Sequence, residues 1–128
     1  MTDFFSDNID VKKLSYNELN ELANSLRKRI ISVTQKNGGH LASNLGAVEL
    51  TIALHKVFDL DKDYIVWDVG HQCYAHKLLT GRGELMENLR HDGGASGFPS
   101  PVESPSDPFI TGHSGNSLSL ALGLARAN

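Results

Sequence analysis

Three histidines in this chain directly follow a glycine: His40, His71 and His113. Six histidines and 12 glycines among 128 residues would give about 0.6 such pairs by chance. Each pair stands where we expect a loop to enter a helix, and free backbone N–H groups at a helix start favour anions. Three such turns predict a site for an anionic group such as a diphosphate, whose oxygens accept hydrogen bonds from N–H groups and imidazoles. The alternative is three unrelated helix starts whose histidines pack or cap, and spacing alone does not separate the two.

The middle pair has the most informative surroundings. The run 65–67 is apolar and rich in β-branched and aromatic residues, which predicts a short buried strand. Gly70 allows another backbone or a ligand to come close. Residues 72–79 then predict a short helix that Gly81 closes. Because open α/β folds bind ligands where a strand turns into a helix, this stretch predicts an α/β fold with a site near His71.

The other elements that must position these turns are mostly helical. Ser15 and Glu18 form a capping-box pattern, and apolar residues recur at helical spacing after it, up to about Asn37 and Gly38. The segment 47–58 is apolar on nearly every side, which predicts a helix buried inside a larger body. Shorter helices are predicted at 84–89 and 118–127. With one strand expected at 65–67, the fold class is α/β, mostly helical in this portion.

The segment 91–108 is a long stretch rich in glycine, serine and proline. A loop of that length is uncommon in a compact domain and is usually functional or disordered. Four prolines stiffen it: Pro99, Pro101, Pro105 and Pro108. We therefore expect an ordered lid or wall over a site.

Composition excludes several classes of protein. The net charge is -3 without a basic stripe, so nucleic-acid binding has no electrostatic support. No window reaches the roughly 20 apolar residues of a membrane span, and the N-terminus lacks the apolar core of a signal peptide. The single Cys73 excludes an internal disulfide and favours a reducing, cytoplasmic location.

Several long motifs, in order, resemble the start of 1-deoxy-D-xylulose-5-phosphate synthases. They are the segments 38–46, 49–51, 67–72, 76–82, 93–94, 96–99, 103–104 and 111–114, and the likeness covers about residues 14–127. Transketolase relatives share parts of this set, but the run from Trp67 to Arg82 is similar to the synthases. The chain departs from the family at Gly115 and Asn116, which replace further hydroxyl residues, and at Ala75, where proline is common. The prolines at 101, 105 and 108 are also additional.

The resemblance implies a thiamine-diphosphate enzyme of the transketolase-like superfamily. The family joins pyruvate to glyceraldehyde 3-phosphate with loss of carbon dioxide, for isoprenoid, thiamine and pyridoxal synthesis. By motif, His40 is the active-site histidine for proton transfer, a step that an imidazole performs near neutral pH. His71 contacts the cofactor, and Gly112, His113 and Ser114 line its diphosphate side.

The resemblance also implies that the site is incomplete. The family's Mg²⁺ ligands, a Gly-Asp-Gly motif and a later asparagine, do not occur here, so no metal ligand is assigned. The glutamate that activates the cofactor belongs to the family's second domain. We therefore expect residues 1–14 to be a lead-in and 15–128 a truncated N-terminal part of the diphosphate-binding domain, inactive alone. A homodimer or a complementing C-terminal chain would complete it. Alternatives are a non-catalytic interaction module or remnant, and part of another transketolase-like enzyme.

Other chemistry has less support. His71 and His76 are five residues apart, a poor spacing for one helix face, and a structural zinc site would need more thiolates than Cys73. Ser114 beside His113 lacks the nucleophile-elbow pattern and an orienting acid. The segment 47–58 contains His55, which is expected to be a satisfied core histidine. Trp67 and Cys73 are expected in the core.

Overall fold

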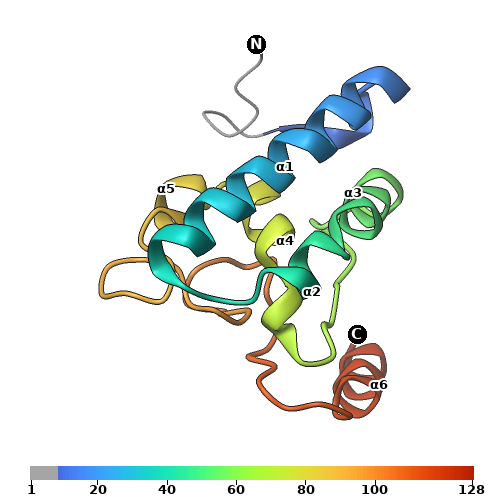
Figure 1. Cartoon of the computed structure of the whole chain (residues 1–128). Helices are drawn as coiled ribbons and strands as arrows, with labels where there is room; N and C mark the ends of the chain where they lie inside the picture. The colour runs from blue at the N-terminus through green and yellow to red at the C-terminus, as the bar shows by residue number, and fades with distance from the viewer. Residues whose placement is uncertain (1–8) are drawn as a thin grey trace.

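The computed structural model describes residues 9–128, and the described part is helical (Figure 1). Its longest element, α1 (Tyr16–Asn37), crosses over the centre of the molecule. The remaining elements are η1 (Val11–Lys13), α2 (Ala42–Leu45), α3 (Val48–Val57), η2 (Gly70–Gln72), α4 (Tyr74–Leu79), α5 (Gly83–Met86) and α6 (Ser117–Ala127). The lead-in expected at 1–14 is described only from residue 9.

The predicted N-terminal helix is confirmed together with its cap. Ser15 Oγ accepts from the Glu18 N–H at 3.2 Å, while the Ser15 N–H donates to Glu18 Oε2 at 2.7 Å. These two bonds satisfy backbone donors that a helix start leaves unpaired. The buried face of α1 is made of Leu22, Ala23, Leu26, Ile30, Val33 and Thr34. This face packs on α3 and α4, so α1 covers one side of the hydrophobic core.

Helix α4 is the centre of the core, and all six of its residues are buried. The sequence predicted a helix over 72–79, and the structure divides that segment into the 3₁₀ turn η2 and α4. Cys73 lies at the junction and is fully buried, which raises the pKa of its thiol to about 12 because burial disfavours the thiolate. Cys73 is therefore a packed apolar side chain, as predicted.

Helix α3 is confirmed, but it is not buried on all sides. Val48, Thr51, Ile52 and His55 face the core, whereas Leu50 and Val57 are 59% and 71% exposed. The expectation of an enclosed helix was wrong for this chain, because nothing in the described part covers the outer side. The inner side also holds η1, since Lys56 Nζ donates to the carbonyl oxygen of Lys12 at 2.7 Å.

The strand expected at 65–67 is absent from residues 9–128, and this correction has a simple cause. Residues 63–67 carry no regular secondary structure, and 64–67 make no backbone–backbone hydrogen bond to any described residue. A strand exists only when a neighbouring strand accepts and donates along its edge. Trp67 is nevertheless in the core, as predicted. The composition is that of a strand, but no residue of 9–128 provides the edge with which it could pair.

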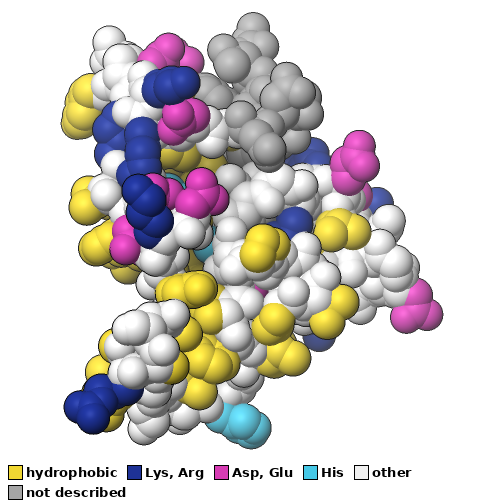
Figure 2. Space-filling view, turned by 180° about the vertical axis from the view of Figure 1, so that it is seen from behind, with side chains coloured by type: hydrophobic (Ala, Val, Ile, Leu, Met, Phe, Trp, Pro, Cys, Tyr) yellow, Lys and Arg dark blue, Asp and Glu magenta, His cyan; other side chains and the backbone are white. Residues whose placement is uncertain are grey.

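The segment 91–108 is irregular and packed, which confirms the expected ordered loop. Ala95, Pro99, Ser104 and Asp107 are buried within it. Helix α6 follows and differs from the rest, because none of its residues is buried. Leu118 and Leu122 are 83% and 65% exposed. Figure 2 shows hydrophobic side chains gathered over the lower end of the molecule, where Figure 1 places α6. None of the helices formed by residues 9–128 combines the length and apolar character needed to cross a membrane.

Candidate functional site

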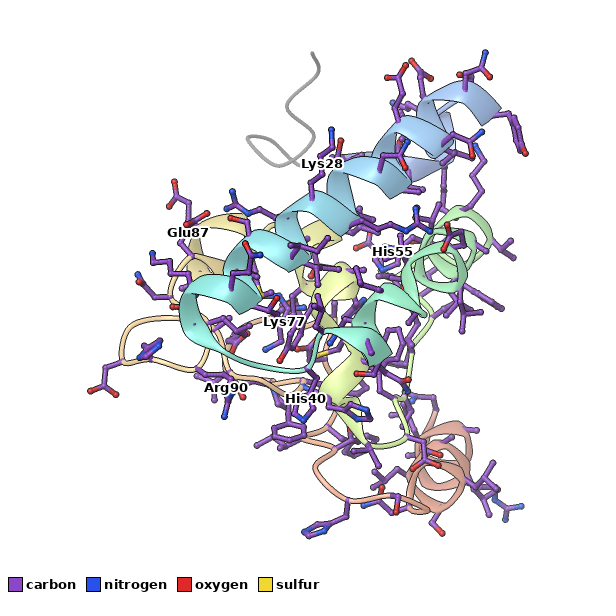
Figure 3. The ribbon with its side chains drawn as sticks, viewed as in Figure 1. Lys28, His40, His55, Lys77, Glu87 and Arg90 are labelled. Atoms are coloured by element: carbon purple, nitrogen blue, oxygen red, sulfur yellow. The ribbon has the colours of Figure 1, made fainter. Side chains whose placement is uncertain are left out.

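His40 and His71 meet in space, although 31 positions separate them in the chain. Their ring centroids are 5.0 Å apart, with the edge of one ring toward the face of the other. His40 lies in the loop between α1 and α2, beneath α2 in Figure 3, and His71 lies in η2. Two of the three predicted glycine–histidine turns therefore converge.

Asn44 joins these two turns, and sequence reasoning assigned it no role. Its side chain is 1% exposed and its Nδ2 donates both to the His40 carbonyl oxygen at 2.6 Å and to the His71 carbonyl oxygen at 2.8 Å. Its Oδ1 accepts from the Tyr74 N–H at 3.0 Å. One buried amide thus fixes both histidine backbones relative to α4. The only signal in the sequence was its place inside the 38–46 motif.

The backbone at His71 is strained in a way that orients its ring. Val69 has φ 50°, a region that β-branched residues rarely adopt. This bend lets the Val69 carbonyl oxygen accept from both the His71 N–H at 2.6 Å and His71 Nδ1 at 2.8 Å. Because a carbonyl oxygen only accepts, Nδ1 carries the proton, and Nε2 of the neutral ring is left as an acceptor. Strain of this kind is commonly found at functional sites.

Phe98 and Pro99 form a wall beside the two histidines. The Phe98 ring centroid is 6.5 Å from that of His40. A Cβ added at Gly70 would lie 2.0 Å from Pro99 Cδ and 2.6 Å from Thr111 Oγ1. Glycine at position 70 therefore permits a backbone approach that no other residue allows. These two residues belong to the segment 91–108, and that it forms a lid or wall over a functional site stays a prediction.

The third turn is attached to the site through its backbone. The Gly70 N–H donates to the Thr111 carbonyl oxygen at 2.6 Å, and the Gly115 N–H donates to Asp68 Oδ1 at 2.7 Å. Between these bonds, Gly112, His113 and Ser114 are exposed, and none of their backbone N–H groups has a hydrogen-bond acceptor within the described chain. The imidazole of His113 makes no ring contact or hydrogen bond with any described residue. The structure therefore brings the turn to the site but not the His113 ring to the other two rings.

The donors on this turn fit a diphosphate better than they fit a metal. Three consecutive free N–H groups stand just before α6, and the Thr111 hydroxyl is buried without a partner. Such donors suit phosphate oxygens. By contrast, residues 9–128 hold no group of three His, Cys, Asp or Glu side chains arranged to bind a metal ion. Backbone N–H groups donate hydrogen bonds and do not ligate cations, so the 112–114 turn itself favours an anion.

A buried network of hydrogen-bonded polar side chains joins α3 and α4 to the loop 91–108. The sequence did not predict it. His55 Nε2 and His76 Nδ1 are 3.0 Å apart, and His76 Nε2 donates to Asp107 Oδ1 at 3.0 Å. Arg82 donates to both oxygens of Asp107, at 2.5 and 3.0 Å. His55 is thus a satisfied core histidine, as predicted. Since His76 is fully engaged here, it is not a metal partner of His71.

Burial determines how His55 and Asp107 titrate. Burial, followed by the nearby charge of His76, lowers the pKa of His55 from 6.5 to about 3. Burial alone would raise the pKa of Asp107, but the hydrogen bonds from His76 and Arg82 outweigh it and hold this pKa well below 3.8. Both groups bind protons more weakly in the folded chain than in the unfolded chain.

We therefore expect the free energy of unfolding to fall as the pH is lowered. Between about pH 6.5 and 3 the unfolded chain protonates His55 while the folded chain does not, and below 3.8 Asp107 adds to the loss. From pH 7 to pH 4 the His55 contribution to the loss of stability is about 3 kcal/mol. Urea unfolding across this range measures it. His55→Gln should flatten the profile, whereas the exposed control His91→Gln should not. Equal slopes in all three proteins would contradict the assignment.

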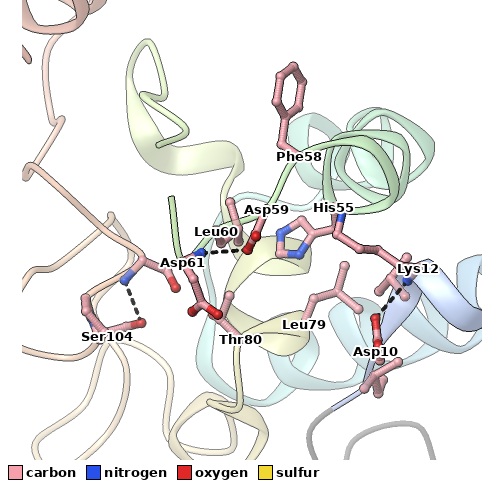
Figure 4. Close-up of a pocket in the computed structure, with 14 residues that line it drawn as sticks. Asp10, Lys12, His55, Phe58, Asp59, Leu60, Asp61, Leu79, Thr80 and Ser104 are labelled. Atoms are coloured by element: carbon pink, nitrogen blue, oxygen red, sulfur yellow. Dashed lines mark hydrogen bonds between the residues drawn. The ribbon is translucent and has the colours of Figure 1, made fainter. Parts of the chain in front are cut away.

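A separate pocket lies on the other side of His55 (Figure 4). Its volume is about 370 Å³, and its lining comes from η1, the end of α3, the turn after it, and 104–106. It includes neither His40 nor His71. The functional assignment therefore rests on the histidine pair and the 112–114 turn, which the backbone hydrogen bond between Gly70 and Thr111 brings together, rather than on this cavity.

Comparison with known proteins identifies the family of this chain. A family model described as 1-deoxy-D-xylulose-5-phosphate synthase matches residues 3–128. The synthase of Chlamydia abortus is 63% identical over 119 residues, which are 92% of this chain and 18% of that protein. The synthases of Dictyoglomus turgidum and Clostridium tetani are 58% and 56% identical over 92% and 98% of this chain, and 19% and 20% of their own length. The chain belongs to the 1-deoxy-D-xylulose-5-phosphate synthase family and spans about a fifth of the length of these relatives.

Proposed function

We propose that this chain is the first part of the diphosphate-binding domain of an enzyme that joins pyruvate to glyceraldehyde 3-phosphate with loss of carbon dioxide. The observation that carries the proposal is the His40–His71 pair, which Asn44 fixes beside the free N–H groups of 112–114. In the relatives this stretch is followed by most of the protein. We infer that the remainder supplies the magnesium ligands, the rest of the substrate site and a homodimer contact or its equivalent. The lone, buried thiol of Cys73 supports a cytoplasmic location.

The residues of this chain have distinct roles in the proposed site. Bound thiamine diphosphate supplies the nucleophilic carbon and the electron sink for decarboxylation. The N–H groups of Gly112, His113 and Ser114 hold its diphosphate as donors. His71, with Nδ1 bound to its own turn, presents Nε2 to the cofactor. His40, which is exposed and adjacent, moves a proton at its ring nitrogen.

The relation of α6 to the extended segment supports an α/β fold for the whole domain. Gly115, just before α6, binds Asp68, while the far end of the helix lies with Lys62, Asp63 and Tyr64 around a cavity of about 350 Å³. The helix therefore runs back along residues 63–67 toward their start. In a right-handed β–α–β unit the next segment becomes a parallel strand beside the first. We propose that such a strand pairs with 64–67.

A chimeric synthase tests the function. This chain would replace the matching N-terminal segment of the Chlamydia abortus synthase. We expect release of carbon dioxide from pyruvate that depends on glyceraldehyde 3-phosphate, thiamine diphosphate and Mg²⁺. His40→Ala should lower kcat by about 10²–10⁴-fold at saturating cofactor, because it removes a proton-transfer group. His91→Ala, an exposed histidine on the packed loop, is the matched control and should keep the rate.

The second candidate, a non-catalytic interaction module, draws support from the exposed apolar residues of α3 and α6. The chimera distinguishes the two. A folded chimera that shows no cofactor-dependent turnover would reject the enzyme assignment and leave the interaction module. Unchanged turnover in His40→Ala would reject the role of His40 alone.

A further inference from the structure

Two carboxylates hold the two ends of the wall segment 96–100. Glu103 Oε2 accepts from the Ser96 N–H at 2.7 Å, and Asp107 Oδ2 accepts from the Ser100 N–H at 2.8 Å. Between these anchors lie Phe98 and Pro99, which face His40 and Gly70. The position of the wall segment is therefore set by hydrogen bonds to two carboxylate side chains, and the segment is not part of a sheet or helix.

The carboxylates are held in turn by two cations, one in α4 and one just after it. Lys77 is 0% exposed, and its Nζ donates to Glu103 Oε1 at 2.8 Å and to the Ser96 carbonyl oxygen at 2.7 Å. Figure 3 shows Lys77 in the middle of the molecule, beneath α1. Arg82 binds Asp107 with two nitrogens and Glu103 at 3.3 Å. Lys77 lies in α4 and Arg82 just after it, while His71 lies just before it.

Buried ion pairs of this kind are a weak source of stability. The cost of removing charges from water largely offsets their attraction, and well-packed apolar residues often serve stability as well. This network contains four buried or nearly buried charges and is bonded to one short loop. We therefore explain it by the position that it gives to the segment 96–100. Glu103 and Asp107 use one oxygen each for a backbone N–H of the wall, and their other contacts lead to α4.

We infer that Glu103 and Asp107 are positioning residues that set the distance between the Phe98–Pro99 wall and the His40–His71 pair. Lys77 and Arg82 bind these two carboxylates, and in this way they fix the wall relative to α4. The importance of this distance for activity rests on the proposed function. The hydrogen bonds that set the distance are independent of that proposal. The wall, the histidine pair and α4 thus move as one body as long as both carboxylates keep their bonds.

Neutral isosteres of Glu103 and Asp107 remove hydrogen bonds to the wall segment with almost no change in side-chain shape. Asp107→Asn has a single acceptor oxygen, so it cannot serve Ser100, His76 and Arg82 together. Glu103→Gln faces the Lys77 ammonium and the Ser96 N–H with the same limitation. Glu103 is at the edge of the network, so Glu103→Gln is the variant expected to remain folded if Asp107→Asn does not. Asp92→Asn and Glu84→Gln, at exposed positions without side-chain partners among residues 9–128, are matched controls.

Hydrogen exchange of the full chain, followed residue by residue by NMR, tests the inference. We expect roughly tenfold or faster exchange at Ser100 in Asp107→Asn and at Ser96 in Glu103→Gln, since each loses a charge-assisted bond. The ring signals of His40 should shift as Phe98 moves, while amides of α1 such as Ile30 and Val33 stay protected. The two controls should match the unsubstituted chain.

Two results would overturn the inference. One is exchange at Ser96 and Ser100 within twofold of the unsubstituted chain in both variants. The other is acceleration spread equally over α1, which would mean that the network serves stability alone. Because the exchange measurement does not require turnover, an inactive chimera would count against the proposed function and not against the positioning role of Glu103 and Asp107. In an active chimera, Glu103→Gln should raise the KM for thiamine diphosphate more than Glu84→Gln does.

Discussion

Asn44→Asp should lower the free energy of unfolding by about 3–5 kcal/mol at neutral pH, the largest effect we expect from a single-atom change in this chain. The native amide donates to two carbonyl oxygens, of His40 and His71, from a side chain that is 1% exposed. A carboxylate at the same place has no hydrogen to donate. It would leave both carbonyl oxygens unpaired and bury a negative charge among them.

The effect should also reach the site. With the shared donor gone, the loop before α2 and the turn η2 lose the contact that holds them together, so the rings of His40 and His71 should separate. Urea unfolding monitored by circular dichroism measures the stability, and ring-to-ring NOEs report the separation. Asn24→Asp, on the exposed face of α1, is the matched control and should change the stability by less than about 0.5 kcal/mol. A similar small change in Asn44→Asp would show that the hydrogen bonds to the two carbonyl groups are not important.

The sequence predicted helices well where nearby residues alone determine where the helix begins and ends. The capping box at Ser15, the apolar period of α1 and the glycine at its end specify that helix without any distant contact. The same applies to α3 and α6 within a few residues. Residues 65–67 show the opposite case. Their composition is that of a strand, but strand formation depends on a partner edge, and no described residue provides one.

The site was predicted in part for a related reason. Glycine before histidine marks a turn at the start of a helix, so the meeting of His40 and His71 was one of the two arrangements that the spacing allowed. That expectation did not hold for the ring of His113, because the backbone of its turn, not its side chain, contacts η2. The polar network around Asp107 could not be found from sequence. Its members come from α3, α4, the turn after α4 and the packed loop, and only the fold brings them together.

Glycine at position 70 shows how strongly packing, rather than conformation, can constrain a residue. Gly70 does not need a positive φ, yet an added Cβ would meet Pro99 Cδ at 2.0 Å, Pro99 Cγ at 2.6 Å and Thr111 Oγ1 at 2.6 Å. The proline ring is not a flexible end that can turn away, and its segment is anchored on both sides by Glu103 and Asp107. Either the wall or η2 must move.

Gly70→Ala should therefore destabilise the chain by about 1–3 kcal/mol, the range of overpacked cores, and displace the wall from His71. Gly123→Ala, where an added Cβ has open space within α6, should instead stabilise by up to about 1 kcal/mol through helix propensity. A double-mutant cycle with Pro99→Ala identifies the cause, because removing Cγ and Cδ of the proline makes room for the new methyl group. We expect the double variant to recover at least about 1 kcal/mol relative to the sum of the single changes. Strict additivity would mean that the alanine is accommodated elsewhere and that the contact between Gly70 and Pro99 does not set the position of the wall.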